Sequence, residues 1–126
     1  AIDTPEKKTF QVRGRDLVSG LPKLISISST EIYEALYEPV SAILEAIRMC
    51  LEKTPPELAA DLMDRGIMIA GGGSLLKGMN TLISRETGMP VHLAEEPLSA
   101  VAIGSGKALE NIDTLKRLLI PNRRIG

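Results

Sequence analysis

The sequence predicts an α/β fold with a small β attachment at its start. Two alternating apolar and polar segments open the chain, amphipathic helical stripes occupy most of the remainder, and two short apolar strands alternate with helices in the second half. The chain has 126 residues, which is enough for one domain with a real core. The expected order is therefore hairpin, helices, strand, helix, strand, helix.

Composition narrows the classes of function. The chain is 44% hydrophobic and 25% charged with a net charge of −1, which is typical of a soluble globular protein. It shows no signal peptide and no apolar stretch near the roughly 20 residues of a membrane span. Balanced charge and few aromatic residues argue against a nucleic-acid partner. Because the chain begins at Ala1 without a methionine and opens directly into strand-like sequence, we expect a piece of a longer protein.

The first 28 residues predict a β-hairpin. Residues 8–13 and 21–28 alternate apolar and polar side chains, and the stretch 14–20 between them carries turn residues at both ends. The loop is longer than a minimal hairpin turn.

A long helical region is expected next. Ser28 or Ser29 can cap it, with Glu31 or Glu34 in the first turn. Pro39 interrupts the region and predicts a kink or two abutting helices, because proline removes a backbone hydrogen bond. The apolar stripe consists of Ile32, Leu36, Ile43, Leu44, Ile47 and Leu51.

A second helix is predicted to start at the run Thr54-Pro55-Pro56-Glu57. Thr54 would be the N-cap, Pro55 would occupy the first helical position, and Glu57 would close a capping box. The helix would end near Gly66, with a buried face formed by Leu58 and Leu62.

The segment that follows combines an apolar strand with three glycines. Residues 67–70 are all apolar and predict a strand buried on both faces, as in parallel sheets. The strand runs into three consecutive glycines and then into a helical stretch. Bare backbone N–H groups without Cβ atoms suit a nucleotide, and a helix start favours an anion or polar group. Three glycines also form an ordinary tight turn, and the residues alone leave both interpretations open.

The last third predicts a helix, a strand, a turn and a final helix. A stripe of Leu75, Met79, Leu82 and Ile83 marks the first helix, which Gly88 ends. Residues 90–93 form the strand and residues 95–97 the turn. The final helix is marked by Leu98, Val101, Ala102, Leu109 and Ile112.

Other candidate sites are interpreted as structural. The run Gly104-Ser105-Gly106-Lys107 lacks residues of a full phosphate loop, so we interpret it as close helix packing. His92 has no partner at ligand spacing, and no metal site is expected. The single cysteine, Cys50, excludes an internal disulfide, fits a reducing cytoplasm and is expected to be a buried structural thiol. Glu95 and Glu96 are expected in a solvated turn. A flexible basic tail is predicted from Lys116, Arg117, Arg123 and Arg124.

Several stretches of sequence occur together in a characteristic order. They are GRDLVSGLP (14–22), LEKTPPEL (51–58), DRG (64–66) leading into GGGSLL (71–76), and ETGMPV (86–91) with EPL (96–98). Together they resemble the C-terminal part of the MreB family, the bacterial actin-like proteins that determine rod shape. The TPPEL run and the triple glycine at this separation are the specific features. The resemblance covers nearly the whole chain, except the first residues and the tail after Leu115.

The resemblance implies part of the second half of an actin-like (ribonuclease H-like) ATPase fold. Residues 1–38 would be a partial small outer subdomain, residues 39–115 the C-terminal part of the larger subdomain, and residues 116–126 the flexible basic tail. The implied cofactor is ATP, with Mg supplied by parts of the family's fold outside this chain. The nucleotide-contacting stretch of the family matches Gly71, Gly72, Gly73, Ser74 and Leu75.

The resemblance also implies partners and a location. Family members polymerise into protofilaments at the inner face of the cell membrane, in the cytoplasm, and organise cell-wall synthesis. A RodZ-type membrane partner is implied, and no nucleic acid. The phosphate loops and the residues that position Mg lie outside the matching part, so we expect the chain alone to hydrolyse no ATP above background.

Two further expectations accompany this interpretation. Strand edges without partners and an exposed apolar face lead us to expect a dimer, either swapped or edge to edge, or a rearranged fold. Two alternatives remain: a half-domain of another actin-fold ATPase of the sugar-kinase or chaperone type, or a stand-alone interaction module without a nucleotide role.

Overall fold

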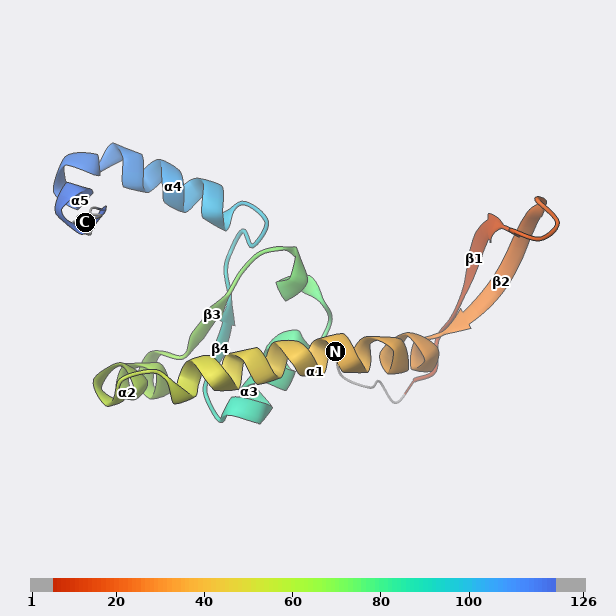
Figure 1. Ribbon diagram of the computed structural model, residues 1–126, viewed down its shortest axis with the longest axis horizontal. Helices are drawn as coiled ribbons and strands as arrows, with labels where there is room; N and C mark the ends of the chain where they lie inside the picture. The colour runs from red at the N-terminus through yellow and green to blue at the C-terminus, as the bar shows by residue number, and fades with distance from the viewer. Residues whose placement is uncertain (1–5, 120–126) are drawn as a thin grey trace, which may run out of the picture.

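The computed structural model describes residues 6–119. Figure 1 shows an elongated arrangement, with a β-hairpin at one end of a long helix α1 and a second helix, α2, at the other. The elements are β1 (Thr9–Arg15), β2 (Pro22–Ser28), α1 (Ser29–Glu52), α2 (Pro56–Arg65), β3 (Ile67–Ile69), the 3₁₀ turn η1 (Gly72–Leu75), α3 (Met79–Thr87), β4 (Val91–Leu93), α4 (Ala100–Glu110) and α5 (Ile112–Leu119).

The predicted hairpin is confirmed. Strands β1 and β2 pair antiparallel, with their register running from Thr9 opposite Ser28 to Arg15 opposite Pro22. The loop is longer than a minimal turn, as predicted, but it spans residues 16–21 and not 14–20, because Gly14 and Arg15 pair with β2. The carboxylate of Asp16 closes this loop. One Asp16 oxygen accepts hydrogen bonds from the backbone N–H groups of Val18 at 2.8 Å and Ser19 at 3.2 Å. These bonds hold the pKa of the Asp16 carboxyl below its ordinary value.

Helix α1 begins at a capping box. The backbone N–H of Glu31 donates to Ser28 Oγ at 3.2 Å, and the backbone N–H of Ser28 donates to Glu31 Oε2 at 2.7 Å. These two residues are therefore the cap and its partner among the expected candidates. The predicted interruption at Pro39 is wrong in one respect, because α1 is a single helix from Ser29 to Glu52 with Pro39 inside it. Its neighbour Val40 is buried in the core, so packing outweighs the lost backbone bond.

The predicted capping box at the start of α2 is wrong. The helix begins at Pro56, its N-cap is Pro55, and no side chain caps it. Thr54 instead donates its hydroxyl to the carbonyl of Cys50 at 2.7 Å, so its side chain closes the end of α1. Pro55 is extended at ψ 146° and separates Thr54 from the new helix. Pro56, and not Pro55 as predicted, occupies the first helical position, where proline is favourable.

Strands β3 and β4 form a parallel pair, with Ile67 opposite Val91, Met68 opposite His92 and Ile69 opposite Leu93. Ile67 and Ile69 pack on the core. Met68, on the other face, is 66% exposed. The expected burial on both faces is therefore wrong for this chain, because within residues 6–119 the sheet has two strands and no layer covers its second face.

The core lies where α1 meets α3. Its buried residues are Val40 of α1 and Met79, Leu82 and Ile83 of α3. The predicted stripe of α3 is therefore confirmed at Met79, Leu82 and Ile83. Leu75 is not part of α3, because the chain after the glycines forms a short 3₁₀ turn first and Gly78 then begins the helix. Gly88 ends α3, as predicted, and it adopts the left-handed conformation.

The final helical region is two helices rather than the single one expected. Asn111 separates them, and its side-chain amide donates to the carbonyl of Lys107 at 2.9 Å, which caps the end of α4. Leu98 lies in the turn before α4, and Ile112 begins α5. Of the predicted tail, Lys116 and Arg117 are helical, whereas Arg123 and Arg124 lie outside the described residues.

Candidate functional site

The glycine run forms a tight turn at the end of β3. Gly71 adopts φ 81°, which only glycine enters without strain, and residues 72–75 form the 3₁₀ turn η1. Ser74 closes this turn, because its hydroxyl donates to the carbonyl of Gly71 at 2.6 Å and its backbone N–H donates to the same oxygen at 3.2 Å. The structure thus places all five predicted residues in one loop, with the Ser74 hydroxyl engaged in holding its shape.

A second loop, which was not predicted as part of the site, joins the glycine run. The backbone N–H of Gly71 donates to the carbonyl of Pro97 at 2.7 Å, and Leu98 approaches Gly72. Both loops follow strands of one parallel pair, so they meet at the carboxyl edge of the sheet, where α/β proteins bind ligands. The signal was present in the strand-helix-strand order, which predicts parallel strands whose following loops share an edge.

Backbone conformation does not require glycine at every position of the run. Among the described glycines, Gly72 and Gly73 do not have positive φ. A Cβ added at Gly73 would meet nothing within 4 Å, and one at Gly72 would make an ordinary contact of 3.5 Å with Leu98. The turn therefore explains Gly71 alone. The open space over Gly73, beside the single ordinary contact at Gly72, lets another molecule approach this backbone closely, so the two residues fit a nucleotide.

A groove of about 600 Å³ runs along α1 beside this loop. Leu76 and Lys77, which directly follow η1, line it opposite Tyr33 and Tyr37 of α1. Sequence reasoning missed these four residues, because the two pairs come from segments about 40 residues apart and only packing brings them to one groove.

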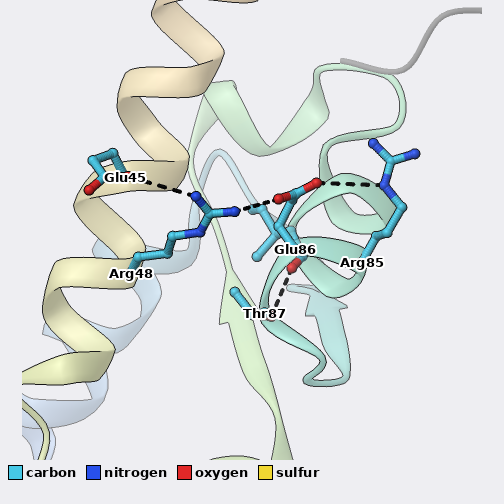
Figure 2. A network of polar contacts seen from close by, with 6 residues as sticks. Glu45, Arg48, Arg85, Glu86 and Thr87 are labelled. Carbon is cyan, nitrogen blue, oxygen red and sulfur yellow. Dashed lines mark hydrogen bonds and ion pairs between the residues drawn. The ribbon is translucent and has the colours of Figure 1, made fainter.

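One end of the groove carries a network of charged side chains. Figure 2 shows Arg48 of α1 reaching across to Glu86 of α3, with a nitrogen to oxygen distance of 2.5 Å. Glu45 lies 3.8 Å from Arg48, and Arg85 lies 3.8 Å from Glu86. The groove is therefore apolar along most of α1 and charged where α1 crosses α3.

The remaining candidates are placed as follows. His92 is exposed on β4, and residues 6–119 contain no group of His, Cys, Asp or Glu side chains that could hold a metal ion. Glu95 and Glu96 lie exposed in a turn, as expected. Cys50 is exposed, so its predicted burial is wrong; the residues of α1 that form or pack against the core are Leu36, Val40, Leu44 and Ile47, and Cys50 is not among them.

The run at 104–107 lies within helix α4, which confirms the interpretation that it is a helical segment and not a phosphate loop. The expected close packing is absent among the described residues, because a Cβ added at Gly104 would meet nothing within 4 Å. Across the described helices, none is both long and apolar enough to cross a membrane.

The sequence matches the family described as MreB/Mbl protein over residues 1–117. The chain belongs to the MreB/Mbl family. Cell shape-determining protein Mbl of Bacillus subtilis is 51% identical over 108 residues, which are 86% of this chain and 32% of that protein. Cell shape-determining protein MreB of Escherichia coli K12 is 49% identical over 108 residues, which are 86% of this chain and 31% of that protein. This chain thus spans about a third of the length of these relatives.

Solved structures of the family share the fold. MreB5 of Spiroplasma citri bound to ADP superposes with a TM-score of 0.79 at 36% identity, over 88% of this chain and 34% of that one. The same protein bound to AMPPNP also gives 0.79, at 34% identity, over 94% of this chain and 36% of that one. The predicted actin-like α/β fold with an N-terminal hairpin is confirmed.

Proposed function

We propose that this chain supplies the adenosine-side loop of an ATP site in an MreB-type actin-like protein. The proposed nucleotide contacts are Gly71, Gly72, Gly73, Ser74 and Leu75. One observation carries the proposal: Gly72 and Gly73 lie at the carboxyl edge of a parallel sheet with no conformational need for glycine, and a Cβ at Gly73 would enter open space. The nucleotides bound by MreB5 support the choice of ligand.

In this proposal the residues of the chain bind and position the nucleotide, and they do not take part in the chemical step. Gly71 and Ser74 hold the loop in shape through their mutual hydrogen bonds, so the backbone of Gly72 and Gly73 stays open to the ligand. Bound ATP with Mg supplies the phosphoanhydride bond that a cytoskeletal ATPase hydrolyses. The groups that position its phosphates and Mg belong to the two thirds of the family's length that this chain does not span.

We infer the same cellular role for the protein that contains this chain. It is a filament-forming cytoskeletal protein that organises cell-wall synthesis, and it works in the cytoplasm at the inner face of the membrane. Self-association along protofilaments and a RodZ-type membrane partner are part of this proposal. It is supported by the cell shape-determining function named for relatives about 50% identical to this chain.

A chimera tests the nucleotide role. Bacillus subtilis Mbl, with its matching 108 residues replaced by those of this chain, is titrated with AMPPNP and Mg in a calorimeter. Gly73→Val should weaken binding at least tenfold, because the added side chain fills the space that the ligand needs. Gly14→Val is the matched control, since a Cβ at Gly14 also meets nothing within 4 Å and lies in the hairpin. Equal affinity of both variants and the parent chimera would refute the proposal and favour an interaction module whose glycines serve only the turn.

A further inference from the structure

The accessible surface of this chain is too large for a compact monomer. It amounts to 10495 Å², whereas a compact protein of 13.6 kDa exposes about 6,600 Å². Counting the residues outside 6–119 at the full value of an extended chain, about 160 Å² each, still leaves an excess of about 2,000 Å². Only four residues of the described range form the buried core, and many large apolar side chains of the same range are exposed.

Helix α4 is one source of the excess. Its eleven residues are small or apolar on every side, with Lys107 and Glu110 as its charges. A helix that is apolar all round is normally buried all round. In this chain Val101 is 78% exposed, a Cβ added at Gly104 meets nothing within 4 Å, and α4 projects away from β3 and β4 (Figure 1). Burying α4 requires atoms on several of its sides that residues 6–119 do not supply.

Strand β3 is a second source of the excess accessible surface. It pairs with β4 along one edge, and no described strand pairs with the other. The N–H of Ile67 donates to Pro90 and the carbonyl of Ile69 accepts from Ala94, so alternation along the strand directs the N–H of Met68 to the free edge. Native edge strands are usually protected by charges or proline, and β3 has neither. The strand has the character of an interior strand of a wider sheet.

The size and position of the exposed β3 edge and α4 surface indicate which molecule covers them: a second copy of this chain or the rest of an MreB/Mbl polypeptide. A second copy related by a twofold axis covers one continuous patch, typically about 800 Å² per partner. Here the excess is about two and a half times that area, and it is divided between a strand edge and a helix that needs cover on several sides. The relatives contain about two further thirds of polypeptide beyond the part that matches this chain. A body of that size can cover both surfaces at once.

We propose that the free edge of β3 and the surface of α4 are docking surfaces for the remaining two thirds of an MreB/Mbl polypeptide, and that this chain binds that body even as a separate molecule. The body adds a strand beside β3 and surrounds α4. The docking does not depend on nucleotide, so it is testable apart from the ATP site.

The test is co-expression of two pieces. This chain, carrying an affinity tag, is produced together with Bacillus subtilis Mbl from which the matching 108 residues have been deleted. We expect the two to purify as a one-to-one complex in native mass spectrometry. Hydrogen exchange at the Met68 amide should slow at least a hundredfold in the complex, because the new strand accepts its N–H.

Matched variants locate the contact. Val101→Arg in α4 should reduce recovery of the Mbl piece at least tenfold. Val18→Arg, at a position 98% exposed in the hairpin loop, should leave recovery unchanged. Both side chains are exposed in the isolated chain, so both variants should keep its circular dichroism spectrum.

Three results would overturn the proposal. The first is that the unaltered chain recovers no Mbl piece. The second is that Val101→Arg and Val18→Arg recover it equally. The third is that the chain alone forms a homodimer in sedimentation which Val101→Arg dissociates and the Mbl piece does not displace, since α4 would then be covered by a second copy.

Discussion

At the scale of single residues, the glycines of this chain have distinct physical roles. Gly66, Gly71, Gly78 and Gly88 adopt positive φ, and each terminates or begins an element. Gly73 does not have positive φ, and a Cβ added there would have no neighbour within 4 Å, so backbone geometry does not require glycine at this position. We therefore assign Gly71 to the geometry of the turn and Gly73 to the proposed approach of a ligand.

Gly66 is the glycine whose replacement should harm the fold most. A Cβ there would collide with the carbonyl oxygen of Pro90, and φ is 81°. We expect Gly66→Ala to lower the free energy of unfolding by about 1–3 kcal/mol or more, measured by urea denaturation of the chain in complex with the Mbl piece or of the chimera. Gly14→Ala, with open space around its Cβ, is the control. Equal midpoints for the two variants would contradict the close approach of β3 to Pro90.

Glu31 should make the stability of α1 depend on pH. Hydrogen bonds from the backbone N–H and the hydroxyl of Ser28 hold the pKa of the Glu31 carboxyl below its ordinary value. Because the folded pKa is the lower one, the contribution is complete above the ordinary pKa of about 4.3 and is lost as the pH falls through the folded pKa.

Helix content and unfolding midpoint, followed from about pH 6 to about pH 3, should therefore decline more steeply in the parent than in Glu31→Gln. Asp16 titrates in both proteins, so the difference between the two curves reports Glu31. Parallel curves would mean that the capping box contributes nothing to this dependence.

At the scale of elements, local chemistry predicted where helices occur better than it predicted their ends. The box at Ser28 formed, whereas the equally plausible box at Thr54 did not, because the Thr54 hydroxyl found the carbonyl of Cys50 one turn back. A threonine between two helices can donate its hydroxyl to a carbonyl of the first helix or accept a hydrogen bond from a backbone N–H of the second. Here the carbonyl at the end of α1 is the partner, so no capping box forms at α2.

The packing of α3 on α1 rests on one deeply buried side chain. Ile83 is 2% exposed and belongs to the small core. We expect Ile83→Ala to lower the free energy of unfolding by about 2–5 kcal/mol in the chimera. Ile43→Ala, the same change on α1 at a position 45% exposed, should have a clearly smaller effect. Similar losses at both sites would contradict the placement of the core between these helices.

The ion pair between Arg48 and Glu86 contributes less than this packing. Both side chains are partly exposed, at 47% and 30%. Exposed pairs of this kind typically contribute about 0.2–1 kcal/mol and weaken with salt. The pair therefore orients α1 on α3 at the charged end of the groove, while the apolar core supplies most of the attachment (Figure 2).

At the scale of the whole molecule, this chain spans about a third of the length of its relatives, and we expect no catalysis from it alone. We expect the purified chain and its Gly73→Val variant to release phosphate from ATP at the same background rate. The reason is that phosphoryl transfer needs groups that position the phosphates and Mg, and these groups belong to the rest of the fold. A coupled phosphate-release assay measures both rates. ATP turnover by the chain that disappears in the Gly73→Val variant would contradict the expectation that the chain alone is inactive.

The local features of this protein could be predicted from its sequence. The hairpin, the Ser28 cap, the stripe of α3 and the left-handed Gly88 follow from hydrogen bonds and contacts between residues close along the chain. The family resemblance and the glycine loop were also visible there. Only packing in three dimensions showed that the loop after β4 meets Gly71, that Tyr33 and Lys77 share a groove, and that Met68, Cys50 and α4 are exposed. The physical reason is that burial and loop contacts depend on atoms distant in sequence, and for β3 and α4 we propose that those atoms belong to the remaining part of an MreB/Mbl polypeptide.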